Sequence, residues 1–385
     1  MGVIIPTIIN GALGAFNRLL MIKVHYGLRS HYRRIMRLNG ISNRPVAGED
    51  DYLKKWKRLS RLVAVEDYRL FSNYIQPSAD LVPEAVSHNI VEAILNPIRY
   101  RPYYADKNMF DKIMPDGFMP PTCLRRINGF YYDADYKPLI EEKIKLDDFT
   151  AMYNRIVIKP TVDSCSGRNV TVLVREKFGW KALNNSSIPN NLTIQNLSKI
   201  WGDNFIVQKC MGQSNFMNYF CPTSVNSIRL FVYRSIKNDE SVVPAAVIRV
   251  GHKGACVDNI HQGGLCVGVY PDGSLANYGT NTMGQRFTKI NDVDLEKEHF
   301  VIPNFENVLA FAKRVGERIT HCRMSNIDVM LDENNQPHLI EYNLTGMSTW
   351  LYQFEVCPAY GIYADEIIEY CAKYLRDASH LMLEY

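Results

Sequence analysis

The sequence predicts an α+β protein with a mainly helical N-terminal third, and three observations support that class. Residues 50–70 carry apolar side chains at helical spacing among lysines and arginines. From residue 155 onward, short apolar runs bounded by polar residues predict strands. The clearest pair of runs, residues 327–331 and 338–343, flanks a polar turn and predicts a β-hairpin.

The composition is that of a cytoplasmic globular protein. With 385 residues the chain can bury a large core and divide into two or three subdomains. A net charge of +4 is too small to argue for nucleic acid as a partner. The nine cysteines are odd in number and form no CxxC pair, which favours reduced thiols over a disulfide framework or a zinc site.

The N-terminal segment has two interpretations. Residues 3–16 are largely apolar and uncharged, and a basic stretch follows them up to Arg37. A secretory signal carries its positive charge before the apolar run, and about 20 apolar residues are needed to span a bilayer. Residues 1–37 therefore either contact the inner face of a membrane peripherally or form a terminal helix packed on the core with its cations toward solvent.

Helices and boundaries complete the N-terminal half. Residues 78–95 predict a second helix, and the aromatic and proline-rich residues 97–104 indicate a boundary. Asp106 is placed to cap a further helix that begins beside Lys107. Later in the chain the sequence predicts helices over residues 139–153, 304–321 and 363–383.

A strand over residues 155–160 places Lys159 at its end, before the small polar residues 161–169 and another strand over residues 170–174. A flexible loop between two strands can wrap phosphates with backbone N–H groups, with the lysine at its root. The alternative is an ordinary hairpin loop with a surface lysine.

The hairpin over residues 326–346 carries candidate metal ligands. Side chains alternate along a strand, so Glu341 and Asn343 share one face, and the hairpin brings Asp328 beside them. Such hard oxygen ligands suit Mg²⁺ on the phosphates of a nucleotide. The alternative is a solvated hairpin, but Asp328 and Glu341 stand among Ile, Val and Leu, where an unpaired carboxylate would be costly.

Further strands are predicted over residues 205–210, 226–234 and 242–250. The last two carry Arg229 and Arg249. Arginines on strands are usually salt-bridged or solvated, but in a phosphate-filled cleft they would act as a charge clamp. The glycine turn at residues 258–264 is either a plain turn or a grip on substrate.

The order of these motifs resembles the ATP-grasp superfamily over about residues 100–360, in particular the sugar-transfer-associated branch found beside bacterial cell-surface polysaccharide genes. The resemblance implies an ATP-grasp fold in which two α+β subdomains hold ATP between their sheets. The N-terminal lobe would then span residues 101–210 and the C-terminal lobe residues 211–385, after a helical region over residues 1–100.

The resemblance also implies roles for individual residues. Lys107 and Lys159 match the two lysines on the α- and β-phosphates. The phosphate loop of the family matches Ser164, Cys165, Ser166 and Gly167, and its hinge beside adenine matches Gln208, Lys209 and Cys210. The Mg²⁺ ligands match Asp328, Glu341 and Asn343. The arginines that face phosphate or acyl phosphate match Arg229 and Arg249. Gln213 and Asn215 are candidates for the ribose contact, and His252 and His261 for accepting a proton from an amine.

The implied function is an ATP-dependent carboxylate–amine ligase that forms an amide through an acyl phosphate, using ATP and Mg²⁺. Its partners would be a small-molecule or sugar carboxylate and an amine, in the modification of cell-surface polysaccharide. Two alternatives stay open. One is a small-molecule kinase on the same fold, and the other is a nucleotide-binding partner without catalysis.

Overall fold

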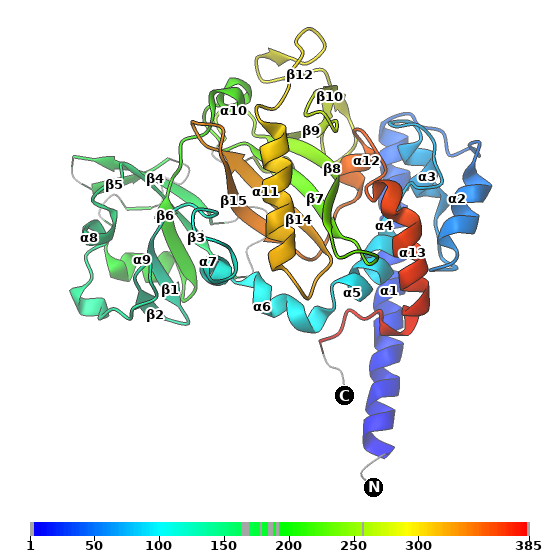
Figure 1. Ribbon diagram of the computed structural model, residues 1–385, viewed down its shortest axis with the longest axis horizontal. Helices are drawn as coiled ribbons and strands as arrows, with labels where there is room; N and C mark the ends of the chain where they lie inside the picture. The colour runs from blue at the N-terminus through cyan, green and yellow to red at the C-terminus, as the bar shows by residue number, and fades with distance from the viewer. Residues whose placement is uncertain are drawn as a thin grey trace.

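The computed structural model describes the chain over residues 4–162, 169–177, 179–183, 188–189, 192–255 and 258–382, with only the backbone described for residues 4–9. Three parts lie side by side (Figure 1): a first sheet, a second sheet, and a group of N-terminal helices that packs with the C-terminal helices. The α-helices are α1 Ile4–Leu38, α2 Glu49–Trp56, α3 Val65–Phe71, α4 Glu84–Val86, α5 Glu92–Leu95, α6 Arg101–Ala105, α7 Phe110–Ile113, α8 Leu146–Thr150, α9 Ile194–Trp201, α10 Asn215–Phe220, α11 Phe305–Arg318, α12 Trp350–Gln353 and α13 Ala364–Lys373.

The strands form two large antiparallel sheets and one small two-stranded ribbon. The first sheet, in the order β2-β1-β6-β3-β4-β5, consists of β1 Thr122–Ile127, β2 Phe130–Tyr132, β3 Arg155–Pro160, β4 Thr171–Glu176, β5 Gly179–Ala182 and β6 Phe205–Lys209. The second, in the order β11-β10-β9-β8-β7-β14-β15, consists of β7 Ser227–Arg234, β8 Ser241–Val250, β9 Leu265–Val269, β10 Leu275–Thr280, β11 Arg286–Phe287, β14 Met324–Leu331 and β15 Pro337–Asn343. The ribbon pairs β12 Lys289–Ile290 with β13 Val293–Asp294.

The two faces of the second sheet are covered by different parts of the chain. One face packs against the amphipathic helix α11, whose apolar side chains lie on Ile228, Leu230 and Ile327. The other face carries Phe231 and Tyr233, which share a core with α2, α3, α12 and α13. Because side chains alternate along a strand, β7 and β14 are buried on both sides and lie at the centre of the molecule.

The N-terminal helices therefore belong structurally to the second sheet. Trp56, which is completely buried, lies against Tyr360, with ring centroids 6.2 Å apart. Residues from the start of the first predicted lobe also pack away from the first sheet, since Tyr104 and Phe110 join the core beneath α11. The first sheet has a separate core whose buried residues run from Cys123 to Val207.

Several predicted helices are shorter or more divided in the structure than the sequence indicates. The helix predicted over residues 50–70 is two helices, α2 and α3, and the one over residues 78–95 begins only at Glu84, directly after Pro83. The charged segment at residues 139–153 holds only a 3₁₀ turn and the five-residue α8. Helical periodicity in short, charged segments does not overcome the cost of starting a helix without an apolar face to bury.

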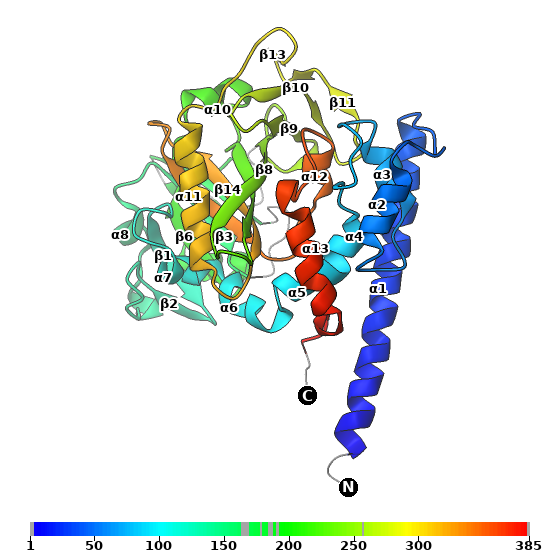
Figure 2. The same ribbon diagram turned by 45° about the vertical axis from the view of Figure 1, so that its right-hand side comes forward.

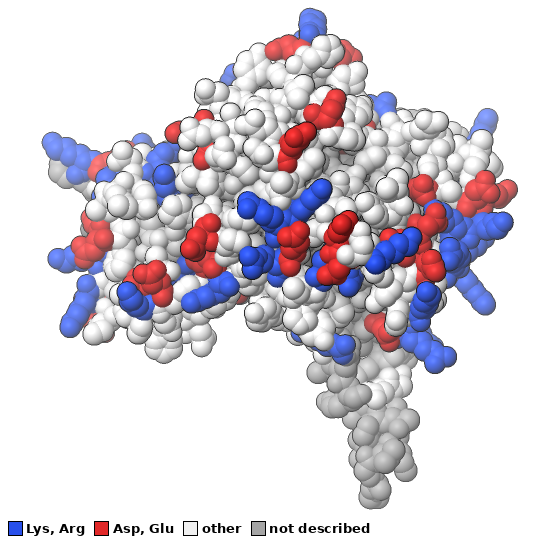
Figure 3. All heavy atoms as spheres, in the orientation of Figure 1, with Lys and Arg blue, Asp and Glu red and all other residues white. Residues whose placement is uncertain are grey.

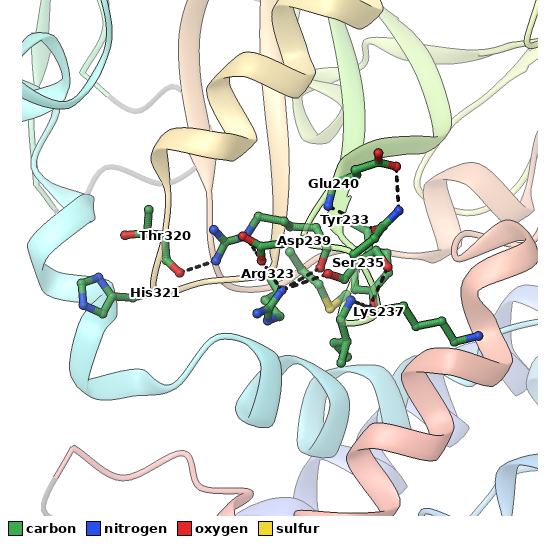
Figure 4. Close-up of polar contacts among 12 residues, drawn as sticks. Tyr233, Ser235, Lys237, Asp239, Glu240, Thr320, His321 and Arg323 are labelled. Carbon is green, nitrogen blue, oxygen red and sulfur yellow. Dashed lines mark hydrogen bonds and ion pairs between the residues drawn. The ribbon is translucent and has the colours of Figure 1, made fainter.

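Polar side chains connect the β7–β8 turn to the start of β14 (Figure 4). Arg323 donates from Nη1 to the carbonyl oxygen of Ser235 at 3.1 Å and to Asp239 at 2.9 Å. Arg234 donates to the carbonyl oxygen of Thr320, just after α11. These contacts fix the strand β14, which carries Asp328, relative to β7, which carries Arg229.

No helix in the described part of the chain is both long enough and apolar enough to cross a membrane. Charges of both signs alternate across the middle of the face shown in Figure 3, in keeping with the small net charge.

Candidate active site

A cleft between the two sheets collects most of the predicted site residues that the structure describes. The first sheet contributes Val157, Lys159 and Gln208 to its wall, and the second contributes Asp328 and Glu341. The cationic side chains Lys107, Lys159, Lys209 and Arg249 outnumber the acids Asp258, Asp328 and Glu341 in the lining. A cleft with this balance of charge suits a polyanion such as a triphosphate.

The two predicted phosphate-binding lysines contact the hairpin β14–β15 of the second sheet. Lys107 follows Asp106, whose side chain accepts from the N–H of Asn108 and so caps the turn, as the sequence predicts. Its Nζ lies 3.4 Å from Oε2 of Glu341. Nζ of Lys159, at the end of β3, donates to the carbonyl oxygen of Ile340 at 3.5 Å.

Lys159 is almost fully buried, and its ammonium group has lost most of its water. Burial is the main reason that its pKa falls to about 8, and the neighbouring charge of Lys107 lowers the pKa further. The carboxylate of Glu341 opposes both effects. A buried cation in the wall of such a cleft gains most from an anionic ligand, because little water is left to compete.

Asp328 makes its main contacts with the two predicted arginines. β14 lies beside β7, and Asp328 faces Arg229 directly across the two strands. Arg229 binds Asp328 with two hydrogen bonds, from Nε at 2.7 Å and from Nη2 at 2.6 Å, and Arg249 adds a third from Nη1 at 3.0 Å. Although burial raises the pKa of Asp328, the two guanidinium groups hold it below its usual value.

The ion pairs continue from Asp328 into a buried network that sequence reasoning found only in part. Arg249 lies 3.3 Å from Asp258, and Ser227 donates to the same carboxylate. Burial raises the pKa of Asp258, while Arg249 and the Ser227 hydrogen bond oppose that rise. Asp258 lies in the glycine turn that the sequence singled out. Ser227, two residues before Arg229, was missed although a period of two places it on the same face of β7.

The predicted metal ligands lie on the hairpin as expected, with Asp328 opposite Glu341 and Asn343 at the end of β15. An irregularity leaves Ile340 unpaired beside Glu341. Across the described residues, no three His, Cys, Asp or Glu side chains form a metal-binding cluster. The donor set still fits Mg²⁺ in chemical type, because each carboxylate oxygen has two lone pairs and the arginines use only part of those of Asp328.

The predicted hinge residues line the same cleft. Gln208 is buried, and its amide nitrogen donates to the carbonyl oxygen of Pro120 at 3.1 Å. Its Oε1 is buried without a hydrogen-bond partner. An unsatisfied acceptor costs free energy unless a ligand supplies a donor, and the exocyclic amine of adenine is such a donor. Lys209 and Cys210 also line the cleft.

The remaining candidates are either outside the described residues or away from the cleft lining. Ser164, Cys165, Ser166 and Gly167 fall outside the described residues. Gln213 is occupied by hydrogen bonds to its own loop, including the carbonyl oxygens of Cys221 and Ser224, both at 2.8 Å. Asn215, His252 and His261 are exposed and do not line the cleft.

A family model for sugar-transfer-associated ATP-grasp proteins matches residues 89–357, about 70% of the chain. The chain belongs to this family. The match begins before the first predicted lobe, so it includes part of the helical region that packs on the second sheet.

Solved structures of ATP-grasp enzymes are similar to this chain at low identity. D-cycloserine synthetase DcsG is 14% identical over 73% of each chain, with a TM-score of 0.41. The ATP-grasp ligase PsnB with its minimal precursor, Mg and ADP is 10% identical, with a TM-score of 0.35 over 73% of this chain and 62% of that one. The D-alanine–D-alanine ligase from Coxiella burnetii is 12% identical, with a TM-score of 0.37 over 73% and 60%. None of the curated proteins matches this sequence.

Proposed function

We propose that this ATP-grasp protein is an ATP-dependent carboxylate–amine ligase. One observation carries the proposal: Lys107 and Lys159 meet the acidic hairpin of the opposite lobe in a single cleft, with Glu341 3.4 Å from Lys107. Cations and acids from distant parts of the chain converge in this way where a metal–triphosphate must be held between them.

In the proposed reaction, an oxygen of the substrate carboxylate attacks the γ-phosphorus of ATP and releases ADP, forming an acyl phosphate. The nitrogen of the amine substrate then attacks the acyl carbon and loses a proton to solvent, inorganic phosphate leaves, and an amide remains. The chain's own residues mainly position and neutralise charge. Lys107 and Lys159 would hold phosphate oxygens, and Gln208 Oε1 would accept from adenine.

Glu341, Asn343 and the remaining lone pair of Asp328 would hold Mg²⁺, which when bound neutralises charge on the phosphates. Arg229 and Arg249 would orient Asp328, and Arg249, which lines the cleft, would also face the acyl phosphate. The carboxylate substrate, a small molecule or a sugar acid, and its use in cell-surface polysaccharide modification belong to the same proposal.

A hydroxylamine trap tests the reaction class. The protein is incubated with Mg-ATP, hydroxylamine and a panel of sugar and amino acid carboxylates, and hydroxamate and ADP are measured. We expect both to form in equal amounts with one class of carboxylate, because only an acyl phosphate gives a hydroxamate. ADP with a phosphorylated hydroxyl compound and no hydroxamate would instead identify a kinase.

A binding measurement tests the nucleotide site by itself. Mg-ATP is expected to raise the melting temperature of the wild-type protein, and Lys159→Met is expected to remove most of that shift. The matched control is Lys199→Met, which changes an exposed lysine on α9 away from the cleft. Equal shifts in all three proteins would contradict the proposed site.

A further inference from the structure

The helix α1 uses only one side of its surface for packing. Its buried side chains include Asn17, Tyr32 and Ile35, which lie in one sector of the helix and face the body. The opposite sector carries large apolar side chains that remain in contact with solvent: Phe16, Leu19, Ile22 and Tyr26 are 53%, 63%, 41% and 55% exposed. Aligned exposed apolar residues on one helix face commonly mark an interaction surface.

The N-terminal turns of α1 extend beyond the rest of the molecule. Asn17 binds the C-terminal segment, donating to the carbonyl oxygen of Ala378 at 3.1 Å and accepting from the N–H of His380 at 2.9 Å. Before Asn17, side chains are described only for residues 10–16, and none of these residues is buried. Both ribbon views show the helix leaving the body in this direction (Figures 1 and 2).

The remainder of the helix is strongly basic. Residues 4–38 contain no Asp or Glu and six cations, Arg18, Lys23, Arg29, Arg33, Arg34 and Arg37. Three of these, Arg29, Arg33 and Arg37, line one hollow together with Tyr26 and Ser30. Arg29 and Arg33 share a single oxygen of Glu66, at 3.0 Å and 2.7 Å, so one acid offsets two of the six cations and a positive excess remains.

We infer that the outward face of α1 binds the surface of an anionic lipid bilayer. The helix would lie in the interface, with Phe16, Leu19 and Ile22 at the acyl boundary and the arginines on lipid phosphates. A second copy of the chain fits poorly, because pairing two such helices would bring their unbalanced cations together. Nucleic acid would use the cations but leave the apolar row exposed. The inference does not depend on the proposed function.

Co-sedimentation with vesicles tests this surface in the full-length protein. Vesicles of phosphatidylcholine alone are compared with an equimolar mixture of phosphatidylcholine and phosphatidylglycerol. We expect binding to the mixed vesicles and a loss of most of it in 0.5 M salt, because screening weakens attraction between exposed charges. Binding to pure phosphatidylcholine should be at least tenfold weaker.

Two variants separate the charged and apolar contributions. Lys23→Gln/Arg34→Gln/Arg37→Gln removes three exposed cations that do not contact Glu66, and Phe16→Ser/Leu19→Ser/Ile22→Ser removes the apolar row. Each should weaken binding at least tenfold, since a cation near an anionic surface changes affinity by about fivefold. The matched controls are Lys289→Gln/Lys297→Gln/Lys373→Gln and Ile362→Ser, all exposed and outside α1, and they should bind as the wild type does.

Three results would overturn the inference. They are equal sedimentation with both vesicle types, equal loss in the control triple variant, and an α1-dependent dimer that sediments with neither vesicle. Unchanged melting temperatures in the variants would show that weakened binding reflects the surface and not unfolding.

Discussion

Asp328 is both the buried ion-pair partner of two arginines and a proposed ligand of Mg²⁺. It is fully buried, it accepts three hydrogen bonds from two arginines, and it stands opposite Glu341 on the hairpin. Glu341 is partly exposed and contacts only Lys107 among the described cations. Replacing Asp328 should therefore lower the stability of the fold more than replacing Glu341, although both are proposed to face the same metal ion.

Glu341→Gln is expected to lower Mg²⁺-dependent ADP formation at least a hundredfold while the melting temperature stays within about 2 °C of the wild-type value. Asp328→Asn is expected to destabilise the protein as well, by about 3–5 kcal/mol, because it leaves two buried guanidinium groups without their shared carboxylate. Steady-state ADP release and thermal unfolding measure the two effects. Full turnover by Glu341→Gln would contradict the proposed metal role.

Nucleotide affinity should depend on pH through Lys159. Because the pKa of Lys159 is lowered to about 8, its amine is largely protonated at pH 7 and only about one tenth protonated at pH 9. The affinity for Mg-ATP should therefore fall by about tenfold as the pH rises from 7 to 9. In Lys159→Arg the charge persists over this range, so fluorescence titrations should show a flat profile. A flat profile in the wild type would refute the assignment.

At the scale of elements, the hairpin β14–β15 is held by a residue from outside both sheets. Asn96 is completely buried and donates to the carbonyl oxygens of Met324 at 2.7 Å and Leu344 at 2.9 Å. Its oxygen accepts from the backbone N–H groups of Arg323 and Met324, both at 3.0 Å. One side chain thus joins the start of β14 to the residue after β15, at the open end of the hairpin that carries the acids.

Asn96→Leu should lower stability by about 3 kcal/mol or more, because several buried backbone groups would lose their partner. It should also raise the Mg²⁺ concentration needed for half-maximal ADP release, since the spacing of Glu341 and Asn343 depends on this end of the hairpin. The control is Asn73→Leu, whose side chain donates only to the nearby carbonyl oxygen of Arg69. A stability loss without any change in Mg²⁺ dependence would limit Asn96 to a structural role.

At this scale the strands β3, β4, β6, β7, β8, β14 and β15 were predictable, because each contains an apolar run between polar residues. The strands β5 and β9–β13 were not predicted. The helices were less predictable. Residues 50–70 have a helical period throughout, yet the chain turns between Trp56 and Val65, because α2 and α3 pack together in the helical core. Periodicity indicates which face is buried, but not where packing against other elements ends the helix.

At the scale of the whole molecule, the first sheet has its own core and the remaining chain shares two cores on the faces of the second sheet. The N-terminal helices cannot be regarded as an appendage, since Trp56 and Tyr68 pack in one cluster with Phe231 and Tyr360. Figure 2 shows these helices beside α12 and α13, close to the second sheet.

Trp56→Ala should therefore destabilise the second sheet as well as the helices, by about 3–5 kcal/mol, because a large buried ring is replaced by a cavity. Calorimetry should show one transition, containing both the helices and the second sheet, moved to lower temperature. Leu62→Ala, which changes a side chain 40% exposed in the same region, should leave that transition in place. If the helices melted separately before the sheet, the shared core would not act as one cooperative unit.

By itself the sequence predicted the fold class and the acidic hairpin, because these depend on residue type and on periods of two along strands. The order of its motifs gave the family resemblance, and only that resemblance implied that Lys107 and Lys159 lie opposite the hairpin. Only the tertiary structure decided that Arg229 and Arg249 bind Asp328, that Asn96 braces the hairpin, and that the N-terminal helices complete the core of the second sheet. Each of these contacts joins residues at least 79 positions apart, and local sequence patterns carry no information about which distant side chains meet.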